Sequence, residues 1–191
     1  MNHQKERKVY LVLTDTGTIF TRLIRLYTKQ TYNHSSLSLD LQLENLYSFG
    51  RKQPWNPFIG GFVKEQVGEG LFKKATCEIY CLNITEEQFQ HIQQQIQQFE
   101  DKQHEYKYNL LGLFALMFRK PLDRENAFFC SEFVSTLLTR SRAVAFNKPT
   151  CFVTPSDLGQ LEDVEYIYQG SIRDYSHTPT KKVLIPILLN G

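Results

Sequence analysis

The segment Asn126–Leu138 (NAFFCSEFVSTLL) contains a cysteine in surroundings that favour reactivity. Apolar residues follow Cys130 at the three- and four-residue spacing of a buried helix face, which predicts a loop running into a helix that begins at this cysteine. Unpaired backbone N–H groups at such a helix start stabilise a thiolate, which is the nucleophilic form of the side chain. The segment therefore makes Cys130 a candidate nucleophile. Taken alone it favours a buried structural cysteine, because free cysteines are among the most buried residues.

A histidine upstream is a candidate for the matching base. Residues 34–44 (HSSLSLDLQLE) alternate between leucine and polar side chains, which predicts a strand with His34 at its first position on the polar face. A histidine that begins a strand and faces away from the core can contact a cysteine at a helix N-terminus. Its imidazole then withdraws the thiol proton and returns it to the leaving group. An inert, exposed histidine at a strand end is the alternative.

The order of these segments resembles the permuted branch of the NlpC/P60 papain-like superfamily. YiiX/YebB-like hydrolases and, more distantly, LRAT-like acyltransferases belong to this branch, in which the histidine precedes the cysteine. The resemblance covers roughly Val9 to Leu161 and rests on NHSSLSLD, LYSFGR, KYNLLGL and FFCSEFVSTLL. It implies an α+β papain-like fold, with an antiparallel sheet packed against helices that include the nucleophile helix. We expect a single domain over residues 1–191.

The resemblance also implies roles for individual residues. Cys130 matches the nucleophile and His34 the general base. The family uses a third polar residue, on the strand after the histidine, to orient the imidazole, and the matching place here is near Ser48. A serine departs from the carboxylate, histidine or amide expected there and orients an imidazole weakly. Asp40 and Glu44 share the polar face of His34 but lie farther along its own predicted strand.

Three aromatic residues are candidates for contacts with substrate. Tyr108 matches a tyrosine that lines the cleft in the family, just ahead of an apolar helix. Trp55 and Phe58 lie in a stretch over residues 51–70 that is rich in proline and glycine, for which the sequence predicts a long loop. A long loop inside a compact domain is commonly functional, so we expect a flap beside the cleft. A loop that merely packs against the core is the alternative.

Composition restricts the partners and the location. A net charge of +2 over 191 residues gives no reason to expect nucleic-acid binding. No apolar run reaches the length of a membrane span, and the N-terminus lacks the apolar centre of a signal peptide, so we expect a cytoplasmic protein. The apolar segment 106–118 predicts a buried helix. A membrane-docking patch is the less favoured interpretation of this segment.

The other three cysteines carry no predicted chemistry. Cys77 and Cys81 share one face of a strand predicted over residues 75–84, and Cys151 lies in a loop or strand without a following helix. The spacing C-x3-C without a second pair does not indicate zinc. We therefore expect neither a metal nor another cofactor.

The remaining elements follow from periodicity and capping signals. Thr85 with Gln88 forms the capping box of a predicted helix whose glutamines face solvent. Strands are predicted over residues 9–14, 46–50, 164–169 and 182–189, and helices over residues 16–28 and 154–161.

Together these features predict a cysteine hydrolase that cleaves an amide bond in small peptides, with cell-wall-derived peptides as candidates by analogy with NlpC/P60 enzymes. The Cys130 backbone N–H, with help from Tyr108, is the expected oxyanion donor. One alternative is an LRAT-like acyltransferase or lipase that uses the same Cys130–His34 pair on an acyl substrate. Another is a non-catalytic binding protein of the same fold, with Ser48 marking a decayed triad. The sequence leaves the oligomeric state open.

Overall fold

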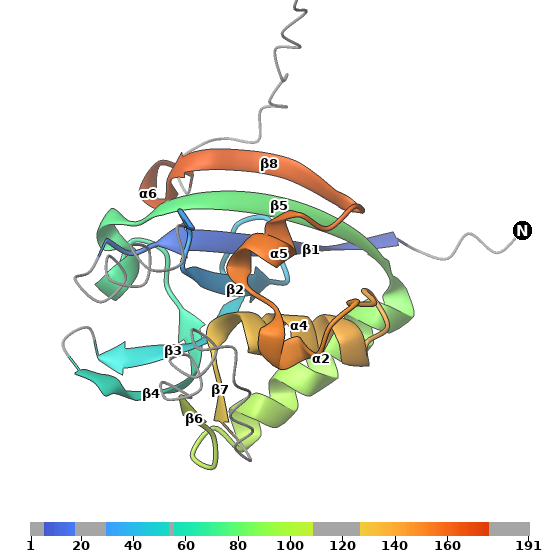
Figure 1. Ribbon diagram of the computed structural model, residues 1–191, viewed down its shortest axis with the longest axis horizontal. Coiled ribbons are helices and arrows are strands. Elements are labelled where there is room, and N and C mark those ends of the chain that lie inside the picture. Colours follow the sequence, from blue (N-terminus) through green and yellow to red (C-terminus); the bar gives the residue numbers. More distant parts are fainter. Residues whose placement is uncertain (1–5, 18–29, 54–55, 109–126, 176–191) are drawn as a thin grey trace, which may run out of the picture.

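The computed structural model describes residues 6–17, 30–53, 56–108 and 127–175 (Figure 1). Over this part of the chain the fold is α+β, as predicted, with one open antiparallel sheet and a few helices. Four of the sequence-based expectations fall outside the described residues: the helix beyond Gly17, Trp55, most of the apolar segment 106–118, and the strand over 182–189.

The sheet has six strands in the order β4-β3-β2-β1-β5-β8, and every neighbouring pair is antiparallel. The neighbouring strands β1 and β5 pair along their whole length, from Glu6 opposite Thr85 to Asp15 opposite Thr76. The strands are β1 (Glu6–Asp15), β2 (His34–Ser38), β3 (Leu46–Gln53), β4 (Asn56–Glu65), β5 (Thr76–Thr85) and β8 (Val164–Ser171).

The sheet opens between β2 and β3. These strands pair at only two positions, Leu37 opposite Tyr47 and Ser38 opposite Leu46, so β3 does not pair with β2 at His34. Figure 1 shows the β3–β4 hairpin running away from the part of the sheet that contains β1, β5 and β8. The helix α4 (Cys130–Arg140) begins at this divergence and contacts both β2 and β3. The opening therefore lets a helix N-terminus approach the first residue of β2.

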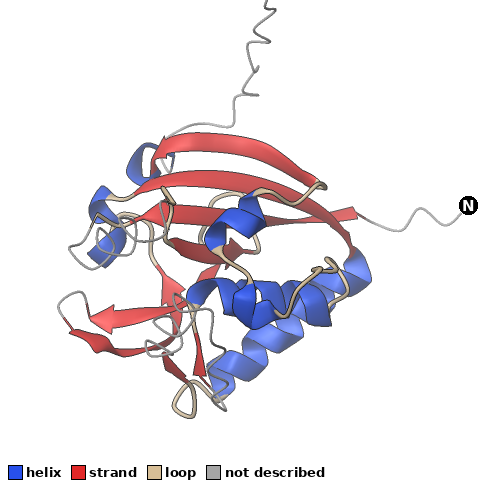
Figure 2. Cartoon of the chain, in the orientation of Figure 1, coloured by secondary structure: helices blue, strands red, loops and turns tan. Residues whose placement is uncertain are grey.

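Alternation along β1 separates two apolar layers. Val9, Leu11 and Leu13 belong to the layer that packs under α4 and α2 (Glu86–Asp101), which lie side by side in Figure 2. Tyr10 and Val12 belong to a smaller layer on the opposite face. This second layer is closed by the 3-10 helix η1 (Gly70–Lys74) and the short helix α6 (Ile172–Tyr175).

A cluster of aromatic rings fixes α4 against the β3–β4 hairpin. Phe133 of α4 lies with its ring centroid 5.2 Å from that of Phe49 and 5.8 Å from that of Phe62. Phe99 of α2 completes the contact, 5.2 Å from Phe133. Aromatic side chains bury large areas, so this cluster holds the helix start and the hairpin in a fixed relation.

The smaller elements connect these layers. The predicted capping box of α2 is confirmed: Gln88 N–H donates to Thr85 Oγ1 (3.2 Å), and Thr85 N–H donates to Gln88 Oε1 (2.9 Å). The predicted short helix is also confirmed, as α5 (Pro155–Gly159). A two-stranded parallel ladder joins β6 (Lys107–Tyr108) to β7 (Ala127–Phe128), and η2 (Thr150–Phe152) precedes α5.

The strand predicted over residues 34–44 is too long. Its hydrogen-bonded part ends at Ser38, and the chain then turns before β3. The Asp40 carboxylate accepts from the backbone N–H of Glu44 (2.9 Å) and of Asn45 (2.8 Å), and Leu43 has a positive φ of 60°. Aspartate side chains that bond to nearby backbone groups compete with a strand ladder, which explains the early end.

The prediction of a long loop over residues 51–70 is wrong. Most of it forms β4, which pairs with β3 and places Gly61 opposite Gly50. Pro57 is tolerated because β4 is an edge strand, where a missing backbone N–H costs no ladder bond on the outer side. Phe58 therefore belongs to an edge strand and not to a flap loop.

In the part of the chain that the structure describes, no helix has the length and apolar character needed to cross a membrane.

Candidate active site

Cys130 is the first residue of α4 and is almost fully buried, with 5% of its surface exposed. The residue before it, Phe129, cannot cap the helix with its side chain, so Glu132 reaches back and accepts from the Phe129 N–H (3.3 Å). Ser131 anchors the first turn by donating to the Val153 carbonyl (2.6 Å). The predicted buried face of this helix is confirmed, since Phe133 and Leu137 are fully buried.

His34 is the first residue of β2 and lies between a carboxylate and the thiol. Its Nε2 is 2.8 Å from Glu65 Oε1, and its side chain is only 15% exposed. The imidazole also lies close enough to the Cys130 side chain for each group to shift the pKa of the other. Because Nε2 is engaged by Glu65, Nδ1 is the nitrogen left to face the sulfur. His34 thus connects the thiol to a buried acid.

Glu65, the last residue of β4, is the carboxylate that orients the imidazole. Register places Glu65 opposite Leu46, and it therefore shares a face of the β3–β4 hairpin with Ser48. Ser48 Oγ donates to Glu65 Oε1 (2.6 Å), and Ser36 Oγ donates to Glu65 Oε2 (2.5 Å). With His34 these hydroxyls satisfy both carboxylate oxygens, which makes burial of the negative charge tolerable.

The electrostatics favour a thiolate facing an imidazolium. Burial opposes charge on both groups, because it lowers the pKa of His34 and raises the pKa of Cys130. The Glu65 carboxylate and the hydrogen bond to Cys130 outweigh this and raise the pKa of His34 to about 10. The neighbouring His34, with a smaller contribution from Ser35, lowers the pKa of Cys130 below the ordinary thiol value. The pair therefore holds its proton on the imidazole at neutral pH.

The two cysteines of β5, Cys77 and Cys81, have raised pKa values, in contrast to Cys130. Burial raises the pKa of Cys77 to about 12, and burial likewise raises the pKa of Cys81. Both are buried in the layer closed by η1 and α6, which confirms the prediction that they are small core residues. These thiols remain protonated at neutral pH, and thiols in that form are poor nucleophiles.

Two further residues lie near the site, Tyr108 beside the start of α4 and Gly50 beside the imidazole of His34. The last residue of β6, Tyr108, pairs with Phe128, two residues before Cys130, so the Tyr108 backbone runs next to the entry to α4. On the other side, Gly50 leaves room beside the imidazole: a Cβ at this position would lie 3.4 Å from His34 Cε1 and 3.5 Å from Ser48 Oγ. A longer side chain at position 50 would enter the space next to the ring.

The structure brings together two of the residues predicted to be catalytic, and it places the third, Ser48, against Glu65 instead of against the imidazole. Cys130 and His34 meet as expected. Ser48 acts on the imidazole only through Glu65, which occupies the orienting position expected for Ser48. Asp40 binds backbone groups of its own turn and is not the orienting acid.

Glu65 is absent from the residues predicted from sequence because the proline and glycine content of residues 51–70 predicts a loop there. The residues GFVKE alternate in a way that fits a strand, and this was the signal that could have placed Glu65 on the same face as Ser48. The proposed contacts of Tyr108 and Phe58 with substrate stay predictions. Within the described residues, no group of three or more His, Cys, Asp or Glu side chains is arranged to hold a metal ion.

Comparison of the chain with models of known protein families finds no match, and comparisons with curated proteins and with solved structures find none either. The resemblance to the permuted NlpC/P60 branch therefore rests on the order of the segments, and the functional argument rests on the geometry of the site.

Proposed function

We propose that this protein is a papain-like cysteine hydrolase of the permuted NlpC/P60 type that cleaves an amide bond in small peptides. The observation that carries this proposal is the Cys130–His34–Glu65 arrangement. A nucleophile at a helix start, a base on a strand and a carboxylate on another strand have the roles that nucleophilic amide hydrolysis requires.

In the acylation step the Cys130 thiolate attacks the carbonyl carbon of the substrate. The backbone N–H of Cys130, at the helix N-terminus, stabilises the negative charge that develops on the carbonyl oxygen. His34 Nδ1 then gives its proton to the departing amine, and the C–N bond breaks to leave a thioester on Cys130. In the second step His34 takes a proton from water, the resulting hydroxide attacks the thioester, and the acid product leaves as the thiolate is restored.

Glu65 serves both steps without contacting the substrate. By accepting from Nε2–H it keeps the imidazole in the orientation in which Nδ1 faces the sulfur, and its charge stabilises the imidazolium. Ser36 and Ser48 are positioning residues, since each donates to one carboxylate oxygen and fixes the plane of the acid. The carboxylate supplies the strong orienting group that a serine alone would not provide.

The test is selective alkylation of the native protein. After brief treatment with iodoacetamide at neutral pH, mass spectrometry of peptides should find Cys130 modified before Cys77, Cys81 and Cys151. A library of short peptide amides should then be cleaved by the wild type and not by Cys130→Ala, with Cys151→Ala as the matched control that retains activity. Faster labelling of another cysteine, or equal cleavage by the Cys130→Ala variant, would overturn the assignment.

Transfer of an acyl group to a lipid, with no cleavage of peptide amides, would instead indicate the acyltransferase alternative.

A further inference from the structure

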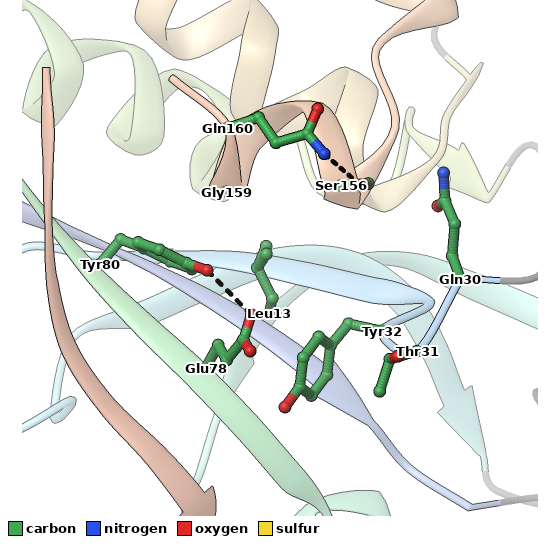
Figure 3. A pocket seen from close by; sticks show the side chains of 9 residues that line it. All are labelled: Leu13, Gln30, Thr31, Tyr32, Glu78, Tyr80, Ser156, Gly159 and Gln160. Atoms are coloured by element: carbon green, nitrogen blue, oxygen red, sulfur yellow. Dashed lines mark hydrogen bonds between the residues drawn. The ribbon is translucent and has the colours of Figure 1, made fainter. Parts of the chain in front are cut away.

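A second feature of the helix side of the sheet is a pocket of about 310 Å³ between the sheet and α5 (Figure 3). In Figure 3, Tyr80, Glu78 and Tyr32 lie on the sheet side, and Ser156, Gly159 and Gln160 of the α5 region lie across from them. The helix sits close to the strands because residue 159 is glycine: a Cβ there would lie 3.0 Å from Leu13 Cδ1. None of the lining residues belongs to the Cys130–His34–Glu65 arrangement.

The chemistry of the pocket is that of a carboxylate among phenol rings. Tyr80 Oη donates to Glu78 Oε2 (2.9 Å). Burial raises the pKa of Tyr32, of Tyr80 and of Tyr166, and the negative charge of Glu78 raises the pKa of each hydroxyl further. The Tyr80 and Tyr166 rings pack edge to face, 5.8 Å apart.

No basic side chain neutralises this carboxylate among the residues that line the pocket. Within the described part of the chain, Tyr80 donates a hydrogen bond to Glu78 and engages one of its two carboxylate oxygens. A half-buried carboxylate in a pocket that is also lined by Tyr32 and Tyr80 attracts an ammonium group and repels an acid.

The register of the sheet sets the distance from this pocket to the nucleophile. Leu13 of β1 pairs with Ser35 of β2 on one side and with Glu78 of β5 on the other, so all three side chains point to the same face. Neighbouring strands are about 4.8 Å apart, which puts the Ser35 and Glu78 backbones about 10 Å from each other. Ser35 lies beside the start of α4, because α4 packs against β2 and Ser35 contributes to lowering the pKa of the Cys130 thiol. The pocket thus lies about three extended residues of peptide from the reacting carbonyl.

We propose that this pocket is a substrate subsite that binds a primary ammonium group through Glu78 and its surrounding tyrosines. The substrates of the Cys130 site would then be small peptides with a lysine-like side chain or a free amine about 10 Å from the scissile carbonyl. This inference rests on the proposed function for the position of attack. The existence of the cation site can be tested separately.

The experiment compares two alkylating probes of equal length. N-chloroacetyl-cadaverine ends in an ammonium group, and N-chloroacetyl-hexylamine ends in a methyl group. In both, the Cys130 thiolate displaces chloride and forms a thioether. The second-order rate of modification should be about tenfold higher for the cationic probe in the wild type, the size expected for one charge-assisted contact in a partly exposed site.

Glu78→Gln should abolish this preference, so that the two probes react at similar rates, and its fold should be retained because glutamine can still accept from Tyr80. Glu165→Gln is the matched control: Glu165 lies on the neighbouring strand β8 and pairs with Cys81, on the opposite face of the sheet, so its loss should leave the preference intact. Equal rates with both probes in the wild type, or a preference that survives Glu78→Gln, would overturn the proposed subsite.

A second measurement separates failure of the subsite from failure of the nucleophile. If neither probe modifies Cys130, the proposed function is wrong, and the subsite is then decided by binding alone. N-acetylcadaverine should shift NMR signals of the wild type in a saturable way, with little effect on Glu78→Gln, and N-hexylacetamide should shift neither. Absence of saturable N-acetylcadaverine binding to the wild type would overturn the cation site.

Discussion

Replacement of Glu65 by glutamine should weaken the thiolate–imidazolium pair while preserving the shape of the site. Glutamine has the same length as glutamate, and its carbonyl oxygen can still accept from His34 Nε2–H and from Ser48. The amide removes the negative charge that lies 2.8 Å from the imidazole. Any change in the titration of Cys130 therefore reports the charge of Glu65 and not a collapse of the hairpin.

The size of the effect follows from the contact that is lost. A hydrogen bond to a charged group in a buried site contributes about 1.5–3 kcal/mol, and one pKa unit corresponds to about 1.4 kcal/mol. Neither side chain is more than 15% exposed, so solvent screens the interaction little. Glu65→Gln should therefore lower the pKa of His34 by about 1–2 units. Because the imidazolium stabilises the thiolate, the pKa of Cys130 should rise by a similar amount.

The assay is the rate of Cys130 carboxymethylation by iodoacetamide as a function of pH. The wild type should become reactive at a pH below the ordinary thiol pKa, since the pKa of Cys130 is lowered, and should lose the imidazolium only as the pH rises through about 10. In Glu65→Gln the acid limb should move to higher pH. On the steep part of that limb the rate should fall roughly 10- to 100-fold.

Glu44→Gln is the matched control, because Glu44 is an exposed glutamate in the turn before β3 and lies outside the site. Its profile should coincide with that of the wild type. An acid limb that stays in place in Glu65→Gln would refute the argument that this carboxylate holds the charge on His34. An unchanged profile in His34→Ala as well would refute the ion pair itself.

Three further predictions follow from the same contacts. Ser48→Ala removes one hydrogen bond to Glu65, so it should shift the acid limb of the iodoacetamide profile by less than one unit, about 1 kcal/mol, and a shift as large as that of Glu65→Gln would show that the hydroxyl matters more than its geometry suggests. Gly50→Val should push a methyl group against the imidazole and lower peptide-amide turnover roughly tenfold or more, whereas Gly50→Ala should cost much less; equal activity of both variants would place the ring elsewhere. Phe49→Ala should lower the free energy of unfolding in urea by about 3–5 kcal/mol, since Phe49 is fully buried among the rings that hold α4, and a loss below about 1 kcal/mol would contradict that packing.

Several features of this protein were determined by local sequence. The start of α4 at Cys130 follows from apolar spacing, and the start of α2 follows from the Thr85–Gln88 capping box. Strands β1 and β5 follow from short runs of apolar residues, and the prediction that Cys77 and Cys81 belong to the core is confirmed. These predictions succeeded because helix periodicity and caps depend on residues within a few positions of each other.

The prediction failed where distant residues decide the outcome. The segment with Pro57, Gly60 and Gly61 has the composition of a loop, but it forms β4 because it pairs with β3 at the edge of the sheet. In the opposite sense, the alternating pattern beyond Ser38 does not continue as a strand, because Asp40 binds the backbone of its own turn. Propensity is a weak guide when sheet pairing or a side-chain bond to the backbone competes with it.

The Cys130–His34–Glu65 arrangement also combines features that local sequence predicts with one that it does not. Sequence alone indicated a nucleophile at Cys130 and a base at His34, because each has a local signature, but it offered Ser48 for the third role. Only the tertiary structure decided that Glu65 orients the imidazole, since this contact joins residues 31 positions apart on strands that are not neighbours in the sheet. Their side chains meet because β3 pairs with β2 at only two positions, which leaves His34 free of β3 at the start of α4. A register of this kind is set by packing across the whole sheet, and no short stretch of sequence carries it.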